Sequence, residues 1–353
     1  MNLLGAAFIL LNSLICGTSA ARQECHIPVD SLSERSKGVI LNKDGEEFSL
    51  KTPKSGVFKW NLDEEITVGC PEDVSTKPCE VPSTRIVIGC ESSTQPSAKV
   101  SDTVCGRTNE GKLIDVGYSS PDGKIAPFYQ LCFDVKKCSV IYSKHTLDGS
   151  AFSTKKSRFR APAPKGLSIC ASYISYFYEE AWQDRNRDSW GLSRDHYFQR
   201  APLVPEVDGP VNSWKGFTHV YVNGAPGWDT VVDGNWAKVA EQVNTLARKS
   251  KKSYSVYSGV VYPENNNHRR FLDRNTNAIE IPQWFWKAVI QGDEGIVFFV
   301  LNDKNPPSKG SKPFCSDNKC QKLGWQFDKA DPNGFVQCCS YESDVQKILP
   351  ESL

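Results

Sequence analysis

The sequence predicts an α+β protein in two parts: a small β-rich domain stapled by disulfides, followed by a larger mixed domain. Three observations predict this arrangement. Cysteines are frequent in the first half of the chain, short apolar runs of strand length recur throughout, and one stretch near residue 240 has apolar residues at helical spacing. With 353 residues and 39% hydrophobic content, the chain is long enough to bury a substantial core.

The first 21 residues, MNLLGAAFILLNSLICGTSAA, contain no charged side chain, and an apolar run from Leu3 to Ile15 precedes several small residues. This pattern is typical of a cleaved secretory signal peptide. A membrane anchor is the disfavoured alternative, because the run is shorter than the ~20 apolar residues that a bilayer requires. We therefore expect a secreted, extracellular protein with no membrane association.

Removal of residues 1–21 takes Cys16 away and leaves twelve of the 13 cysteines. An even number of cysteines in a secreted chain predicts disulfides, whose pairing the sequence leaves open. A zinc site is the weaker alternative, because no paired Cys-x-x-Cys with matching histidines occurs.

The elements follow in order along the chain. Residues 22–152 are expected to form the cysteine-rich β domain, with strand-like runs at 56–62, 84–90 and 138–144. Residues 153–166, STKKSRFRAPAPKG, are basic and proline-rich, which predicts a linker. The second domain is expected at 167–353, with strands at 168–178, 217–223, 253–262 and 295–302 and a helix at 235–249.

The net charge is only +1, so no strong attraction of the whole molecule to polyanions is expected. Basic residues nevertheless gather locally, and each cluster is a candidate polyanion site, with a solvated surface as the alternative. One cluster lies beside Tyr254 and Tyr257, which could stack on bases. The clusters are Lys136, Lys137, Lys144, Lys155, Lys156, Arg158, Arg160 and Lys165; Arg248, Lys249, Lys251 and Lys252; and His268, Arg269 and Arg270.

Four blocks of the second part resemble the non-specific DNA/RNA endonucleases of the ββα-metal class, especially their secreted arthropod branch. The blocks occur in the order expected for that family and cover roughly residues 168–340. They are YFQRAPLVPEVD (197–208), YVNGAPGWDTVVDGNW (221–236), YSGVVY (257–262), and IPQWFWKAV with GIVFFVLN (281–302). The resemblance implies a ββα-metal nuclease-like fold for this domain.

The resemblance also implies where catalytic groups belong. The family's first block reads approximately Tyr-Phe-x-Arg-Gly-His, and its histidine, the general base that activates water, aligns with Pro202, which has no ionisable group. The asparagine that binds Mg²⁺ aligns with Val232, which offers a hard cation no oxygen. The glutamate of the following helix aligns with Ala240, and the phosphate-steadying arginine aligns with Asn244. The spacing of 21 residues from Pro202 to Asn223 supports this register.

Other groups remain near the altered positions. Arg200 keeps the family's arginine position, where it can contact a phosphate. His196, Asp229 and Asp233 are weak candidates for displaced catalytic or metal-binding groups, and Glu241 lies next to the lost glutamate.

We therefore expect a catalytically degenerate family member that binds DNA and RNA non-specifically through phosphates and needs no cofactor. One alternative is a weak, Mg²⁺-dependent endonuclease that uses the displaced groups. A second alternative is a secreted protein-interaction module that merely inherited the fold.

Overall fold

The structure is a computed structural model that describes most of the chain. The described residues are 24–29, 32, 38–80, 90–153, 167, 169–194, 196–263, 269–304, 314–315, 319–327, 333–347 and 349. Four parts of the sequence predictions lie outside them: the signal peptide at 1–21, residues 84–89 of the strand expected at 84–90, residues 154–166 of the linker with its five basic side chains, and His268.

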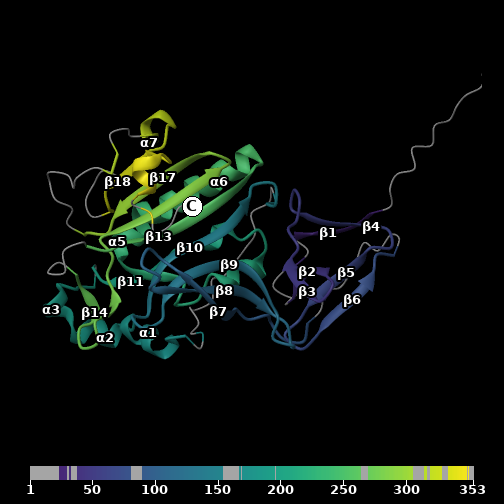
Figure 1. The fold of residues 1–353 in the computed structure, drawn as a ribbon, viewed down its shortest axis with the longest axis horizontal. Helices are drawn as coiled ribbons and strands as arrows, with labels where there is room; N and C mark the ends of the chain where they lie inside the picture. The colour runs from purple at the N-terminus through teal and green to yellow at the C-terminus, as the bar shows by residue number, and fades with distance from the viewer. Residues whose placement is uncertain are drawn as a thin grey trace, which may run out of the picture.

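The N-terminal part is built from two small antiparallel sheets, which occupy one end of the molecule in Figure 1. Strands β1 and β4 pair with each other, and the second sheet has the order β3-β2-β5-β6. The strands are β1 (Glu24–Pro28), β2 (Val39–Asp44), β3 (Glu47–Leu50), β4 (Val57–Asn61), β5 (Glu65–Gly69) and β6 (Val74–Pro78). This confirms a small β-rich unit at the N-terminus, which the Cys25–Cys79 and Cys70–Cys90 disulfides cross-link.

The centre of the molecule is an eight-stranded antiparallel sheet in the order β18-β17-β16-β13-β10-β9-β8-β7. Its strands are β7 (Ser97–Cys105), β8 (Gly111–Ser119), β9 (Ile125–Asp134), β10 (Ser139–Asp148), β13 (Ser253–Val261), β16 (Trp284–Gln291), β17 (Glu294–Leu301) and β18 (Val336–Ser340). Two short ribbons flank it, β11 (Phe198–Pro202) with β12 (Gly224–Trp228), and β14 (Phe271–Asp273) with β15 (Ala278–Glu280).

This sheet corrects the domain division that we predicted from the sequence. Strand β10 pairs with β13 over seven residues, from Tyr142↔Gly259 to Asp148↔Ser253. The sheet therefore crosses the expected boundary at residues 153–166, and the Cys138–Cys170 disulfide joins its two sides. Backbone hydrogen bonds between distant strands leave no local signal in the sequence, whereas a basic, proline-rich stretch does.

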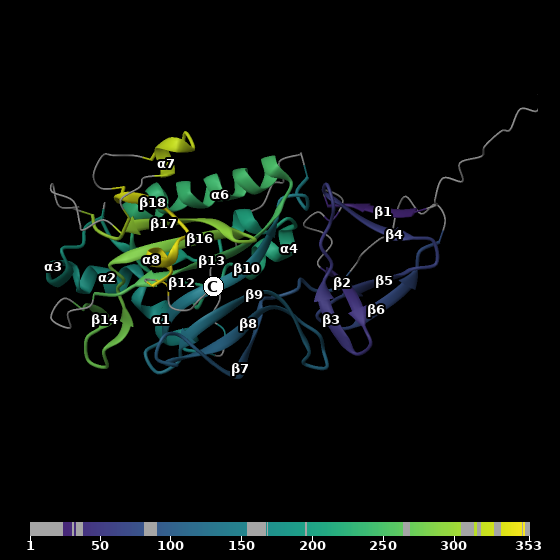
Figure 2. The same cartoon turned by 45° about the horizontal axis from the view of Figure 1, so that its top comes forward.

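The helices are short except for α6, which lies along one face of the central sheet (Figures 1 and 2). They are α1 (Ala171–Phe177), α2 (Glu180–Arg185), α3 (Arg187–Trp190), α4 (Asn212–Phe217), α5 (Asp229–Val231), α6 (Ala237–Ser250), α7 (Lys319–Lys322) and α8 (Ser343–Gln346), with a 3₁₀ turn at Glu206–Asp208 and a π-helical turn at Val232–Trp236. Among the described residues, no helix combines the length and the apolar character that crossing a membrane requires.

Two strand predictions are wrong. Residues 168–178 contain helix α1 instead, because Ile174 and Phe177 are buried at a spacing of three, on one helical face. Residues 217–223 form no strand, because the buried Asn223 side chain takes the backbone partners there: its amide donates to Thr218 O at 3.0 Å and Val204 O at 2.8 Å.

The remaining predicted elements are confirmed where they are described. The helix at 235–249 is α6, and the runs at 253–262 and 295–302 correspond to β13 and β17. Strand β16 buries Phe285 against one hydrophobic cluster and Trp284 and Trp286 against another, so both faces of the sheet are covered. All twelve cysteines pair, as Cys25–Cys79, Cys70–Cys90, Cys105–Cys132, Cys138–Cys170, Cys315–Cys339 and Cys320–Cys338.

Candidate nucleic-acid interface

The ribbon β11–β12 carries the first two blocks of the resemblance. Pro202 pairs with Gly224, and Arg200 pairs with Pro226. The chain then turns through α5 and the π-helical turn into α6, and the indole of Trp236 donates a hydrogen bond to Pro202 O at 2.9 Å. The strands and the helix of the ββα arrangement are thus in place around Pro202.

Carbon fills the position that the resemblance assigns to the metal-binding asparagine. Val232 is buried, and one of its methyl groups would lie 2.5 Å from a Cβ placed on Gly227, a space also bordered by Phe285 and Ala201. Ala240, at the glutamate position, is buried as well. Neither side chain carries an oxygen, so positions 232 and 240 do not fit a magnesium ion.

Asn244, which aligns with the family's arginine, makes hydrogen bonds that hold the fold together. Its amide donates to Val207 O at 2.6 Å and lies 3.5 Å from Asp208 Oδ1, and the side chain is buried. These bonds tie α6 to the 3₁₀ turn at the end of the first block. Glu241 is exposed on the solvent side of α6, one residue away from the buried Ala240.

The displaced candidates do not gather in one place. The Asp229 carboxylate accepts the Tyr197 N–H at 3.0 Å and is buried, so it caps the ribbon. Asp233 is exposed, and His196 lies in a turn whose backbone bonds to Ser193. Within the described residues, His196, Asp229 and Asp233 form no group that could hold a metal ion.

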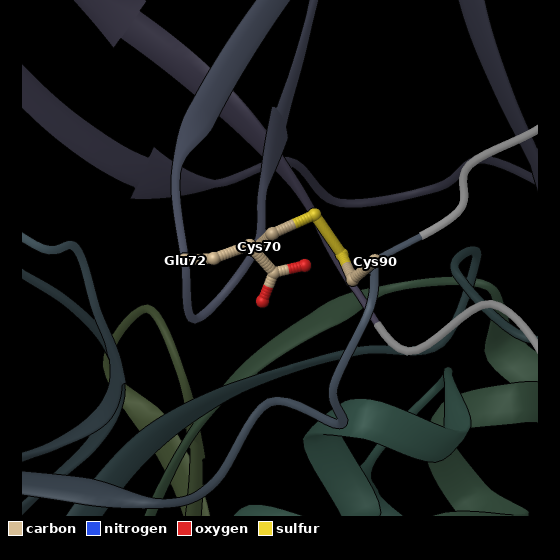
Figure 3. A group of neighbouring side chains, drawn as sticks. All are labelled: Cys70, Glu72 and Cys90. Atoms are coloured by element: carbon tan, nitrogen blue, oxygen red, sulfur yellow. A yellow bond between two sulfur atoms is a disulfide. The ribbon is translucent and has the colours of Figure 1, made fainter.

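One other group does satisfy a metal-ligand geometry in the described chain. Ligand atoms of Cys70, Glu72 and Cys90 lie within 4.8 Å of one another. Figure 3 shows the two cysteines joined as a disulfide, with the carboxylate of Glu72 beside it. That carboxylate accepts the Ser92 hydroxyl at 3.0 Å. Disulfide sulfurs are not thiolates, so the group is structural.

A buried polar cluster lies beneath the ribbon and α6, and it was not predicted from the sequence. Lys287 of β16 is fully buried, its ammonium donates to Leu203 O at 3.1 Å and to the Ser258 hydroxyl, and it lies 5.5 Å from the Trp236 ring centre. Asp208, also buried, accepts from His145 Nε2 at 3.0 Å. In the sequence, Lys287 is a single charged residue within an apolar run, and nothing local indicates its partners. Only the fold shows which groups surround it.

The buried ammonium of Lys287 makes stability depend on pH. Burial lowers its pKa from 10.5 to about 8, and the negative charge of Asp208 opposes that shift. Between these two pKa values the unfolded chain binds a proton that the folded chain lacks, so the free energy of unfolding rises with pH. From pH 8 to about 9.5 we expect a gain of about 2 kcal/mol, at about 1.4 kcal/mol per unit.

Urea unfolding at pH 8 and about 9.5 measures this gain in the wild type and in Lys287→Met. In Lys287→Met, the free energy of unfolding is expected not to rise between these two pH values. Equal slopes in the two proteins would contradict a lowered Lys287 pKa. Above pH 10 the trend reverses, because burial raises the pKa of Tyr129 and of Tyr262, and both then stay protonated longer in the folded state.

The basic cluster at the end of α6 is on the surface but only partly available. Lys249 and Lys251 are exposed. Arg248 donates to Ser153 O at 3.0 Å and lies 5.3 Å from the Phe152 ring centre, and Lys252 donates to Gln291 Oε1 at 3.1 Å. Sequence reasoning missed Lys215, whose pKa burial lowers and whose charge the neighbouring Arg248 repels.

Tyr254 and Tyr257 do not provide the stacking surface that we predicted beside this cluster. Tyr254 is buried and its hydroxyl donates to Ser250 Oγ at 3.1 Å. Tyr257 is half-buried against the second hydrophobic cluster. Both residues lie on strand β13, where Tyr254 packs into the first hydrophobic cluster and Tyr257 packs against the second.

The third basic cluster borders a groove of about 910 Å³. Arg270 is exposed, whereas the Arg269 guanidinium pairs with the buried Glu280 carboxylate, which raises the pKa of Arg269. Two further cations line this groove: Lys137, which the sequence assigned to the first basic cluster, and Arg274, which sequence reasoning missed although it follows Arg270 by four residues. The Arg274 guanidinium lies 4.2 Å from the Trp190 ring centre.

Arg200 is the remaining predicted phosphate contact. Its guanidinium donates through Nη1 to Asn223 O at 3.1 Å and to Thr218 O at 3.3 Å. It borders a second cavity, of about 600 Å³, together with Tyr178 and Tyr221.

The chain is similar to several known proteins. A salivary endonuclease of Culex quinquefasciatus is 29% identical over 344 residues, which cover 92% of this chain and 89% of that protein. A salivary endonuclease of Lutzomyia longipalpis is 27% identical over 355 residues, which cover 94% of this chain and 86% of that protein. Among solved structures, a chain of the EndoG/EndoGI complex aligns with a TM-score of 0.34 and 14% identity, over 58% of this chain and 84% of that one.

The family model described as DNA/RNA non-specific endonuclease matches residues 109–328. The match begins just before β8, so it includes strands of the central sheet that precede the expected linker. It spans more than half of the sequence, and this chain therefore belongs to the DNA/RNA non-specific endonuclease family.

Proposed function

We propose that this protein is secreted and binds DNA and RNA non-specifically through the phosphate backbone, with little or no hydrolysis. One observation carries the proposal. Where the family resemblance places a general base, metal ligands and a phosphate-steadying arginine, this chain has Pro202, Val232, Ala240 and Asn244, and the last three are packed or hydrogen-bonded into the core.

The binding half of the proposal is supported by cations at three places. The end of α6 presents Lys249 and Lys251, the groove beside β14 presents Arg270, and Arg200 faces a cavity. Neutralising phosphates with such side chains releases counterions, so binding is independent of sequence and weakens with salt. Without a group that activates water, the complex persists.

Secretion is supported by the apolar segment at 1–21, by the disulfides and by the salivary relatives. Disulfides persist in oxidising extracellular surroundings and are rare in the cytosol. The cation sites require no bound cofactor.

A titration of labelled duplex DNA, with Mg²⁺ and with EDTA, tests the proposal. We expect a gel shift at low salt without cleavage, and log affinity that falls linearly with log salt, by about 0.9 for each phosphate contacted. Lys249→Gln combined with Lys251→Gln is expected to reduce that slope by about 2. The control Lys43→Gln, an exposed lysine of β2, should leave it unchanged. No shift with any nucleic acid at low salt would overturn the proposal.

The two salivary endonuclease relatives favour a second candidate, a weak Mg²⁺-dependent endonuclease. This candidate requires cleavage that EDTA abolishes and that His196→Ala or Asp229→Ala reduces. Cleavage that is unchanged in both variants would point to a contaminating nuclease. A protein partner that is captured equally well after nuclease treatment would instead support an interaction module.

A further inference from the structure

The cavity beside Arg200 has a cation in its wall and aromatic rings around it. It has a volume of about 600 Å³ and is bordered by Tyr178, Arg194, Tyr197, Arg200 and Tyr221. Its walls come from β11, from the turn before it, from α2 and from the segments that follow α1 and α4. Pockets of about 300–1,000 Å³ with a few convergent polar groups are the usual size for small ligands.

The Arg200 side chain is half-buried, and its charge has no anionic partner among the described residues. In the described part of the chain it bonds only to two carbonyl oxygens, Asn223 O and Thr218 O, and no carboxylate forms an ion pair with it. Its Nε is buried and has no hydrogen-bond partner among the described residues. Burial lowers the Arg200 pKa. A cation that is partly withdrawn from water gains from an anionic partner, so this site favours an anionic ligand.

Two tyrosines provide an aromatic wall next to this charge. The rings of Tyr178 and Tyr221 are stacked, with centres 6.0 Å apart and planes at 17°. The Tyr178 hydroxyl is buried and has no partner within the described residues, and the charge of Arg200 acts on it. The fold therefore leaves a donor and acceptor unused beside a cation, inside one cavity.

Two other polar side chains of the wall, Gln183 and Asp184, already have partners. The Gln183 side chain exchanges both of its hydrogen bonds with the Phe198 backbone, at 2.7 and 2.9 Å. The Asp184 carboxylate pairs with Arg187 at 2.5 Å. Tyr197 is 37% exposed at the rim, and the exposed Arg194 adds a second positive charge there. The unpaired polar groups thus converge on Arg200 and Tyr178.

We propose that this cavity receives one unpaired nucleotide of a single-stranded nucleic acid, with its phosphate on Arg200 and its base against the Tyr178–Tyr221 wall. This inference rests on the proposed function and specifies single-stranded nucleic acid as the preferred ligand. Unpaired bases can leave the strand and stack on aromatic side chains, whereas bases of a duplex are held in their own stack. Arginine suits the phosphate because its guanidinium offers several donors in a plane.

Fluorescence anisotropy of the whole protein with a labelled oligothymidylate and with a duplex of equal length tests this. The wild type is expected to bind the single strand more tightly at equal salt. Stacking on an aromatic side chain contributes about 1–3 kcal/mol per base, so Tyr221→Leu should weaken single-strand binding about tenfold, with duplex binding nearly unchanged. Arg200→Gln should weaken it by at least as much.

Two variants separate this effect from misfolding and from general loss of charge. Tyr178→Phe removes only the hydroxyl that the fold leaves unpartnered, so it should melt like the wild type and still lose part of the single-strand preference. Lys249→Gln, which lies outside the cavity, should weaken the binding of the single strand and of the duplex to the same extent. Folded cavity variants that keep the wild-type ratio of single-strand to duplex affinity would overturn the inference.

Failure of the proposed function gives a different result. If neither strand type binds, the proposed function fails, and thymidine monophosphate, thymidine and inorganic phosphate are titrated instead. Binding of the monophosphate that is stronger than binding of the other two, and that Arg200→Gln abolishes, would keep the cavity as a nucleotide site. Inorganic phosphate that binds as well as the monophosphate, or no binding at all, would overturn it.

Discussion

Replacement of Asp208 by alanine is expected to lower the free energy of unfolding by about 3–5 kcal/mol, the usual cost of leaving a buried charge without its partner. Asp208 is 2% exposed and its carboxylate lies 3.0 Å from His145 Nε2. Its charge also stabilises the buried ammonium of Lys287. In Asp208→Ala, His145 and Lys287 stay in the core without the carboxylate of residue 208.

Urea unfolding at pH 7 measures this loss. The matched control is Asp233→Ala, which removes an exposed carboxylate from the turn before α6 and should change stability by less than about 0.5 kcal/mol. Asp208→Asn, which keeps the shape and one acceptor oxygen, should fall between the two. A loss of less than about 1 kcal/mol in Asp208→Ala would show that the cluster is not a stabilising unit.

Gly149→Ala is expected to cost about 3 kcal/mol and to weaken nucleic-acid binding as well. A Cβ at Gly149 would lie 1.8 Å from Ala247 O and 2.3 Å from Ala247 C, and both atoms belong to the backbone of α6. No side-chain rotation relieves such a contact, so the helix end must move, with strain typical of overpacking. Gly149 also donates its N–H to Lys252 O at 2.8 Å. The displaced segment is the one that carries Lys249 and Lys251.

Thermal melting together with the duplex titration measures both effects. The control is Gly216→Ala in α4, where an added Cβ meets no atom within 4 Å. Because alanine favours helix over glycine, that control should be neutral or slightly stabilising. Wild-type melting and wild-type affinity in Gly149→Ala would show that the contact between β10 and α6 tolerates displacement.

The short-range parts of the fold could be predicted because their cause is local. Helix α6 follows from apolar residues at helical spacing, and β13 and β17 follow from apolar runs of strand length. The run at 168–178 was misassigned because its apolar residues fit both periods, and the helix that forms there begins beside the Cys138–Cys170 disulfide. Where a run fits both periods, contacts with residues far away in the chain determine whether it forms a helix or a strand.

The residues of the candidate site also fall into two groups, those that were predicted from the sequence and those that were not. Arg200, Lys249, Lys251 and Arg270 were predicted from their positions in the sequence, and the structure places them on or near the surface or at a cavity. Lys215 was missed, and Lys137 was assigned to another cluster, because each comes close to its partners only after distant segments fold together. Arg274 was missed although it follows Arg270 by four residues.

By itself, the sequence determined the family, the even set of cysteines and the residue types at the positions where the family resemblance expects catalytic groups, because these depend on side-chain chemistry at fixed spacing. Only the tertiary structure decided that strands from both sides of the basic stretch share one sheet, and that Asp208 and Lys287 are buried in one cluster. It alone placed Arg200 beside the Tyr178–Tyr221 stack. Burial and proximity arise from contacts between residues far apart in the chain, which no local pattern records.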